Sequence, residues 1–205
     1  MVKHVKKIVL LISLLGIMEI FSGCATVKPS PAQLQLMSWQ QRSTQLKAIQ
    51  HFTLKGSLGI TQANKVDILS FDWQQNYRNY EINLHGPLSL GGAKIVGDQN
   101  GIAYWKNSAE KVFAKSPESL FYQQFGWTLP VSNLKYWILA IPASTKIHDQ
   151  QFDKFNHLIC LVEQDWRIRY SDFISVNGVD LPTRIQLESP QIKIKIVIKT
   201  WQVST

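Results

Sequence analysis

The C-terminal run over residues 192–199 constrains the fold more than any other part of the chain. It reads Ile-Lys-Ile-Lys-Ile-Val-Ile-Lys, which puts four isoleucines on one side of an extended strand and Lys193, Lys195 and Lys199 on the other. This period of two is typical of a strand with one buried and one solvated face. We expect the lysine face to be solvated or to protect a sheet edge; contact with anionic lipid headgroups is the less favoured alternative.

The same period of two recurs along most of the chain from Phe52 onward. Further strand segments are predicted near residues 52–60, 69–73, 80–84, 93–96, 102–104, 112, 159–163, 166–170, 173–176 and 184–188. Asn177-Gly178 is the strongest hairpin signal, since both central residues of a type I′ turn need positive φ. Many short strands at this spacing predict an antiparallel sheet.

Helix signals precede and interrupt the predicted strands. Ser30-Pro31 reads as the N-cap and first-turn proline of a helix that continues through Gln50. A second Ser-Pro pair opens a short helix over 116–125, and another helical run covers 134–140. Because the last two helices are rich in apolar residues, we expect them to cover one face of the sheet in a layered α+β domain.

The first 24 residues have the pattern of a cleaved secretory signal. Three early lysines precede an apolar run over 8–18, and Phe21-Ser22-Gly23-Cys24 follows. The apolar run is too short for a spanning helix, which needs about 20 residues. Its Ser-Gly-Cys end resembles the lipobox of bacterial lipoproteins, in which the cysteine is acylated and becomes the first residue of the mature protein. An ordinary secreted protein with Cys24 as a spare thiol is the alternative.

These signals predict three regions: a cleaved signal over 1–23, a lipidated tether over 24–31 and a single domain over 32–205. The lipobox resemblance implies N-acyl and S-diacylglycerol groups on Cys24, and Ala25 after it implies delivery to the outer membrane. The net charge of +8 becomes +6, or 19 minus 13, when Lys3, Lys6, Lys7 and Glu19 leave with the signal. In an envelope compartment this basic charge favours anionic headgroups or an acidic protein as partner over nucleic acid. A merely soluble basic surface is equally compatible with that charge.

Signatures of catalysis are missing from the sequence. It holds no CxxC, HExxH, P-loop, GxSxG or GxGxxG motif. His51 and His157 are interpreted as ordinary residues at strand edges, and Asp149 and Asp153 as parts of a polar loop. Cys160, in an apolar strand, is expected to be a buried, inert thiol. We therefore predict a protein that is not an enzyme and binds no cofactor or metal, with an envelope hydrolase as a minor alternative.

Two apolar helices over a sheet can leave a cavity between the layers, which is where hydrophobic ligands bind. A fully packed core is the alternative, and alternation alone does not say which strand face is inside. We expect the faces of residues 69–73 and 80–84 to meet the two helices. The predicted lining residues of the cavity are Leu69, Phe71, Trp73, Tyr80, Ile82, Leu84, Trp137 and Ile138.

The connection over residues 85–92 is unusual because it carries Leu88 and Leu90 among residues that make turns. Apolar side chains on such a connection either fold back onto the core or stay exposed for a partner or a bilayer. Since single exposed leucines are common, the residues by themselves favour an ordinary turn.

Taken together, these features resemble the LolB family of outer-membrane lipoproteins. The resemblance rests on Trp39 with Leu46, Phe71-Asp72-Trp73-Gln74-Gln75, Pro87-Leu88, Ser132-Asn133-Leu134-Lys135-Tyr136-Trp137-Ile138-Leu139, and the terminal strand that ends near Trp201. It implies a strongly curved antiparallel sheet, an open half-barrel, with a few helices closing an apolar cavity. It also implies that the protein, acting as a monomer, accepts acylated lipoproteins from the periplasmic carrier LolA and inserts them into the phospholipid of the outer membrane.

The same resemblance implies a membrane-insertion role for an exposed leucine that maps onto Leu88. The connection departs from the family pattern by carrying Leu90 and Gly91-Gly92, so either leucine or both could serve as the membrane probe. A lipid-binding or structural envelope lipoprotein that does not act on other lipoproteins is the alternative to this interpretation.

Overall fold

One curved antiparallel sheet organises the computed structural model, which describes residues 30–31, 36–63, 65–86, 92–106, 110–126 and 129–204. The strand order is β7-β6-β5-β4-β3-β2-β12-β11-β10-β9-β8, and β1 pairs with β10 off this path. The strands are β1 (Ser30–Pro31), β2 (His51–Gln62), β3 (Lys65–Asn76), β4 (Asn79–His85), β5 (Gly92–Gly97), β6 (Ile102–Lys106), β7 (Glu110–Ala114), β8 (Ile147–Phe152), β9 (Leu158–Glu163), β10 (Trp166–Val176), β11 (Val179–Glu188) and β12 (Ile192–Ser204). The helices are α2 (Trp39–Ala48), α3 (Pro117–Phe125) and α4 (Val131–Trp137).

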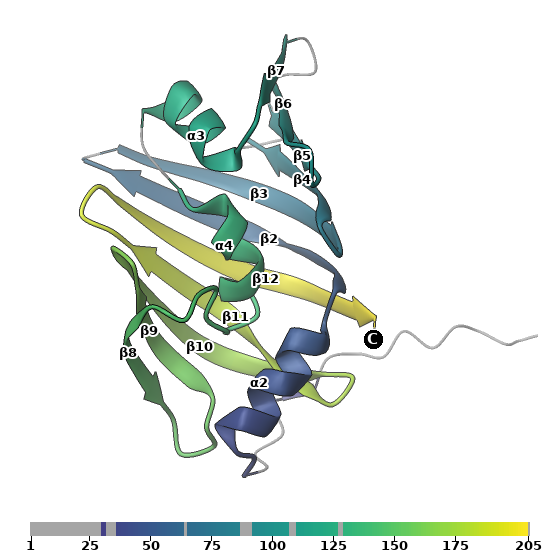
Figure 1. Ribbon diagram of the computed structural model, residues 1–205, viewed down its shortest axis with the longest axis vertical. Coiled ribbons are helices and arrows are strands. Elements are labelled where there is room, and N and C mark those ends of the chain that lie inside the picture. Colours follow the sequence, from purple (N-terminus) through teal and green to yellow (C-terminus); the bar gives the residue numbers. More distant parts are fainter. Residues whose placement is uncertain are drawn as a thin grey trace, which may run out of the picture.

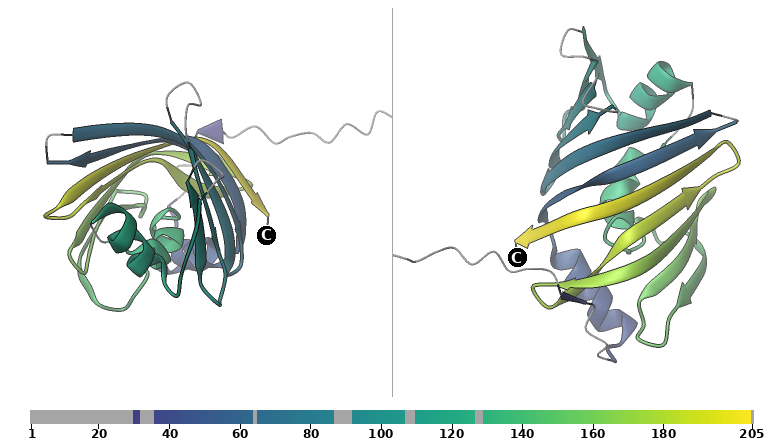
Figure 2. Two further views of the ribbon diagram at one scale, coloured as in Figure 1. Left: turned by 90° about the horizontal axis from the view of Figure 1, so that it is seen from above. Right: turned by 180° about the vertical axis from the view of Figure 1, so that it is seen from behind.

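The sheet wraps around the helices without closing into a barrel (Figures 1 and 2). Figure 2 shows α3 and α4 inside the concave face, while α2 covers the end near the β10–β11 hairpin. This arrangement confirms the predicted open half-barrel with helices on one face. Among the described helices, none combines the length and apolar character that a membrane crossing requires.

The Ile-Lys alternation produces the inner and outer faces of β12 as predicted. The isoleucines at 192, 194, 196 and 198 are buried, and the lysines point to the outer face. A register shift between Ile198 and Thr200 then adds one residue, so that Trp201 and Val203 return to the buried side. The strand therefore continues to Ser204, beyond the alternating run that predicted it.

The N-terminal helix begins later than predicted. Ser30 and Pro31 form β1, paired with Ser175 and Ile174 of β10, so the predicted cap at Ser30 is wrong. Ser38 caps α2 instead: its hydroxyl accepts from the backbone N–H of Gln41, whose side chain accepts from the Ser38 backbone in return. The last two residues of the predicted tether thus belong to the sheet.

Three further boundaries differ from the sequence-based expectations. The segments predicted over 166–170 and 173–176 form one strand, β10. The polar loop expected around Asp149 is largely the edge strand β8, which has no fully buried residue and shows no apolar alternation. Helix α4 begins at Val131, three residues before the predicted start. The Ser116 cap of α3 is confirmed, and Gly126 ends that helix at φ 75°.

A buried carboxyl group on β9 fixes the helical layer over the sheet. Glu163 is fully buried, and its Oε2 accepts from the indole N–H of Trp137 at 2.9 Å and from the backbone N–H of Ala143 at 3.0 Å. One strand side chain therefore holds both α4 and the segment that follows it.

A second buried polar cluster joins α2 to β11. His157 directly precedes β9, at the strand edge as predicted, but it is only 2% exposed and so is not an ordinary residue there. Its Nδ1 lies 2.8 Å from Asp153 Oδ2 and its Nε2 lies 2.9 Å from Asp180 Oδ2. Arg42 of α2 reaches the same oxygen of Asp180 at 3.3 Å. The imidazole stacks on Phe173, which completes its burial.

Replacing Glu163 tests whether this carboxyl group holds the helical layer. Glu163→Ala leaves two buried N–H groups without an acceptor and should lower the free energy of unfolding by about 2 to 3 kcal/mol. Glu163→Gln keeps an acceptor oxygen and should lose less than about 1 kcal/mol. Urea unfolding monitored by tryptophan fluorescence measures both, and equal losses would show that the hydrogen bonds do not matter.

The environment of Asp153 predicts a loss of stability in acid. Burial raises the pKa of its carboxyl group, but hydrogen bonds from the His157 ring and from the backbone N–H groups of His157 and Phe155 outweigh burial and hold the pKa below the ordinary 3.8. A pKa depressed in the folded state adds stability above the unfolded-state value, and this stability disappears as the pH falls through the folded-state value. The free energy of unfolding should therefore fall below about pH 4, and less steeply in Asp153→Asn.

The matched control for this acid effect is Asp149→Asn, because Asp149 is exposed on β8. Its unfolding free energy should follow that of the unaltered protein from pH 6 to pH 3. An Asp153→Asn curve that also runs parallel to the unaltered protein would contradict the assignment.

Candidate apolar binding site

An apolar cavity of about 90 Å³ lies between the concave face of the sheet and the helical layer. Every residue around it is apolar. The lining residues are Leu58, Ile60, Phe71, Trp73, Ile82, Leu84, Ile95, Phe121, Leu129, Val131, Leu134, Ile138, Leu187, Ile194 and Ile196. Such a surface can bind hydrocarbon by burial and offers no group for acid–base or nucleophilic chemistry.

Strand register builds the floor of the cavity. Phe71 stands opposite Leu84, and Trp73 stands opposite Ile82, which in turn stands opposite Ile95. Because side chains alternate across a strand, these cross-strand pairs all lie on the concave face. The indole N–H of Trp73 is satisfied by the side chain of Gln75 at 3.1 Å, so the ring presents its apolar part to the cavity.

Gly56 is required where β2 passes the bulge of β12. It stands opposite Ile198, and a Cβ there would overlap the carbonyl oxygen of Val197 and press on the ring of Phe71 at 3.1 Å. Only glycine lets the two backbones approach at this point while the Phe71 ring stays against the sheet.

The two helices of the concave side form the roof. Phe121 comes from α3, and Val131 and Leu134 come from α4. Glu118 of α3 accepts a hydrogen bond from the backbone N–H of Ser132 at 3.1 Å, which joins the two helices across the segment between them. The roof is therefore one connected layer, anchored to the sheet through Glu163.

The predicted lining residues fall into two groups. Phe71, Trp73, Ile82, Leu84 and Ile138 lie together around the cavity.

The other three predicted residues do not line it. Leu69 is half-buried on the same face, opposite Leu58. Tyr80 borders an adjoining polar pocket of about 210 Å³ that shares Trp73 with the cavity. Trp137 is fully buried and hydrogen-bonded to Glu163.

The phenol of Tyr80 stays neutral. Burial raises its pKa, and the nearby carboxyl groups of Glu118 and Asp98 add to the effect.

Sequence reasoning missed ten lining residues. Alternation placed those of the strands on one face, and helix composition marked those of α3 and α4 as apolar, but neither signal separates a cavity wall from a packed core. The missed residues are Leu58, Ile60, Ile95, Phe121, Leu129, Val131, Leu134, Leu187, Ile194 and Ile196.

Cys24, Leu88 and Leu90 lie outside the described residues. The strands on either side of the two leucines are described: His85 at the end of β4 pairs with Gly92 at the start of β5. The roles predicted for these three residues stay predictions.

Comparisons with known proteins agree with this architecture. The profile of the family described as "Outer membrane lipoprotein LolB" matches residues 50–201. A Coxiella burnetii protein named outer-membrane lipoprotein LolB is 37% identical over 186 residues, covering 89% of this chain and 88% of the relative. A Francisella tularensis protein of the same name is 31% identical over 195 residues, covering 95% of this chain and 94% of the relative.

Two solved structures share the fold at low sequence identity. A LolA superfamily protein from Nitrosomonas europaea has a TM-score of 0.51 at 11% identity, covering 82% of this chain and 94% of that chain. A DUF1329 family protein from Desulfovibrio piger has a TM-score of 0.54 at 8% identity, covering 82% of this chain and 91% of that chain. The family profile and the curated relatives together show that this chain belongs to the LolB family of outer-membrane lipoproteins.

Proposed function

We propose that the protein accepts acylated lipoproteins from a periplasmic LolA-type carrier and inserts them into the inner leaflet of the outer membrane. The observation that carries this proposal is the wholly apolar cavity under α3 and α4. In a lipoprotein of the outer membrane, such a cavity has acyl chains as its natural ligand. The proposed chemistry is binding and release, with no covalent step.

The cost of exposing acyl chains to water explains why a cavity is needed. Three chains carry on the order of 40 methylene groups, and at about 0.8 kcal/mol for each group their exposure costs roughly 30 kcal/mol. Cargo must therefore pass from one shielded site to the next. An apolar cavity in a protein held at the membrane provides the last shielded site.

The size of the cavity indicates that the roof must move when cargo enters. Its volume is about 90 Å³, which is smaller than an engineered apolar cavity of about 150 Å³ that binds one benzene molecule. Acyl chains can enter only if the helical layer separates from the sheet, which replaces contacts of Phe121 and Leu134 with contacts to the ligand. Apolar surface is then covered in both states, which keeps the free-energy difference between them small.

Leu88 and Leu90 keep the role predicted for them, which is contact with the membrane during release. Insertion of two leucines into lipid is worth about 2 to 5 kcal/mol. That is far below the cost of exposing the cargo, so the leucines would lower the barrier of release without driving transfer.

Filling the cavity should reduce binding of acyl chains. In Leu84→Trp the larger ring occupies space next to Trp73. Transfer of an acylated lipoprotein from loaded carrier to the mature Cys24→Ala chain should therefore fall about tenfold. Overpacking should also lower the free energy of unfolding by about 1 to 3 kcal/mol. Copurification of cargo with the protein measures transfer.

Leu69→Trp is the matched control, because Leu69 lies on the same face outside the lining. It should accept cargo within about twofold of the unaltered protein. Equal acceptance by Leu84→Trp and the unaltered protein would show that the cavity is not the acyl site.

A charge at Leu88 should separate acceptance from release. Leu88→Glu cannot enter hydrocarbon, so insertion of bound cargo into liposomes should fall at least tenfold while acceptance from the carrier stays unchanged. Leu36→Glu, at a residue that is 79% exposed, controls for the added charge. Full insertion activity in Leu88→Glu would refute the membrane role, and loss of acceptance alone would assign the residue to carrier binding.

A further inference from the structure

The outer face of the sheet carries an aromatic and basic surface that the cavity does not use. Trp105 on β6 stands opposite Lys94 of β5 and Lys111 of β7. Phe113 follows two residues after Lys111 on the same face of β7 and is 69% exposed. We call these four residues, Lys94, Trp105, Lys111 and Phe113, the Trp105 face.

The ammonium group of Lys111 lies among aromatic rings. Its Nζ is 4.8 Å from the ring centre of Trp105 and 4.3 Å from that of Phe113. Lys94 is paired with Glu81 at 2.8 Å, whereas the contacts of Lys111 with described residues are those with the two rings. A shallow groove of about 540 Å³ borders Trp105, Lys111 and Phe113. An external anion can therefore reach Lys111 beside exposed aromatic carbon.

Protection of the sheet edge accounts for only part of this composition. β7 is an edge strand, and an outward lysine is a common way to block pairing with another chain. That role gives no reason for Phe113 to be exposed next to it. Aromatic rings interleaved with lysines are instead typical of surfaces that lie at the boundary between water and lipid headgroups.

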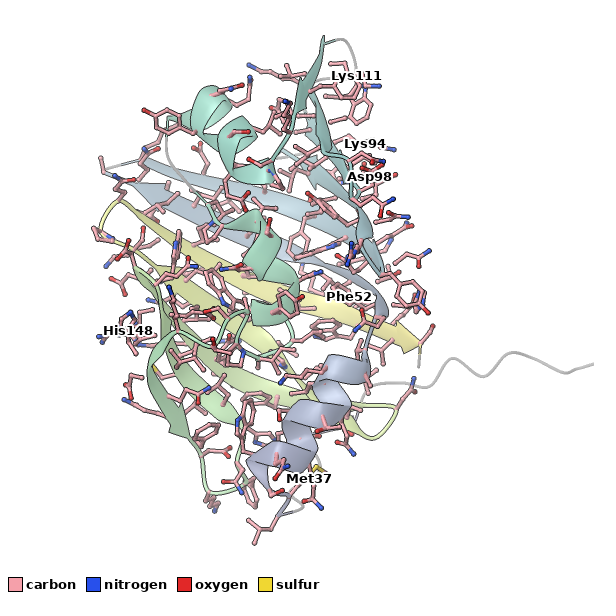
Figure 3. All side chains as sticks on the ribbon, viewed as in Figure 1. Met37, Phe52, Lys94, Asp98, Lys111 and His148 are labelled. Atoms are coloured by element: carbon pink, nitrogen blue, oxygen red, sulfur yellow. The ribbon has the colours of Figure 1, made fainter. Side chains whose placement is uncertain are left out.

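The Trp105 face lies on the convex side of the sheet, away from the cavity. The neighbouring residues Ile95 and Tyr104 point to the buried side, so the two lysines and two rings lie on the opposite side of the sheet from the cavity. Figure 3 labels Lys94 and Lys111 on this outer side. A ligand in the cavity cannot touch them.

We infer that the Trp105 face docks on a phospholipid bilayer with anionic headgroups and so orients the cavity relative to the membrane. The family places the chain at the outer membrane, where a bilayer is within reach at all times. β5, which carries Lys94, begins at Gly92, so the Trp105 face lies on strands that directly follow the Leu88–Leu90 connection in the sequence. The inference uses the location of the family and does not depend on cargo transfer.

Vesicle binding by the mature Cys24→Ala chain tests this surface, because the variant removes the proposed anchor. The protein should cosediment with vesicles of phosphatidylethanolamine and phosphatidylglycerol, and much less with vesicles of phosphatidylcholine alone. Lys111→Glu combined with Phe113→Gln should weaken partitioning roughly tenfold. Lys146→Glu combined with Leu36→Gln removes a matched lysine and apolar residue, both exposed, and should stay within about twofold.

A second measurement locates the contact. An environment-sensitive fluorophore on Lys111→Cys should shift its emission to the blue on addition of the anionic vesicles, and the same fluorophore on Lys146→Cys should not. Circular dichroism and urea unfolding should be unchanged in all variants, since the replaced side chains are exposed.

Unchanged partitioning of the Lys111/Phe113 variant, or absence of the fluorescence shift, would overturn the inference. The inference would also be overturned if the Lys111/Phe113 variant bound vesicles normally but failed to self-associate or to capture the carrier. That result would assign the Trp105 face to a protein partner. If vesicle binding behaves as expected while cargo transfer fails, the docking surface stands and the proposed function falls.

Discussion

The cavity depends on one buried carboxyl group. Glu163 accepts hydrogen bonds from Trp137 and from the backbone after α4, and through them it fixes the distance between the helical roof and the sheet. The sheet alone would expose its concave face to water, and α3 is joined to α4 through Glu118 and Ser132. A side chain on β9 therefore holds the roof over a floor that runs from β5 to β11.

The architecture could be predicted from the sequence to the extent that local periodicity encodes it. The Ile-Lys run set the two faces of β12, and Asn177-Gly178 and Ser116-Pro117 marked a hairpin and a helix start where the structure has them. β8 was missed because an edge strand that buries little surface needs no apolar alternation. The start of α2 differs because Ser30 and Pro31, which form a helix-start signal in the sequence, pair with β10, and the helix begins at the capping box of Ser38.

The site was less predictable because its limits are set by contacts between distant segments. Leu69 and Phe71 have the same side-chain direction on β3, yet only Phe71 meets the cavity. Trp137 looked like a lining residue, but its indole N–H finds a partner 26 positions away, which draws the ring into the core. His157 is bound between carboxyl groups on either side of it in sequence, one of them 23 residues away, and no periodic pattern predicts that environment. Alternation gives the direction of a side chain, and tertiary packing decides whether it meets a void.

Mapping the contacts of a bound acyl chain tests the central claim most directly. An acylated lipoprotein that carries a photoreactive diazirine in its acyl chains would be transferred to the protein, irradiated and analysed by mass spectrometry. The account predicts crosslinks to cavity residues such as Leu58, Phe71 and Ile196. Crosslinks confined to outer-face residues such as Val66 and Ile68, which are 59% and 64% exposed, would contradict it.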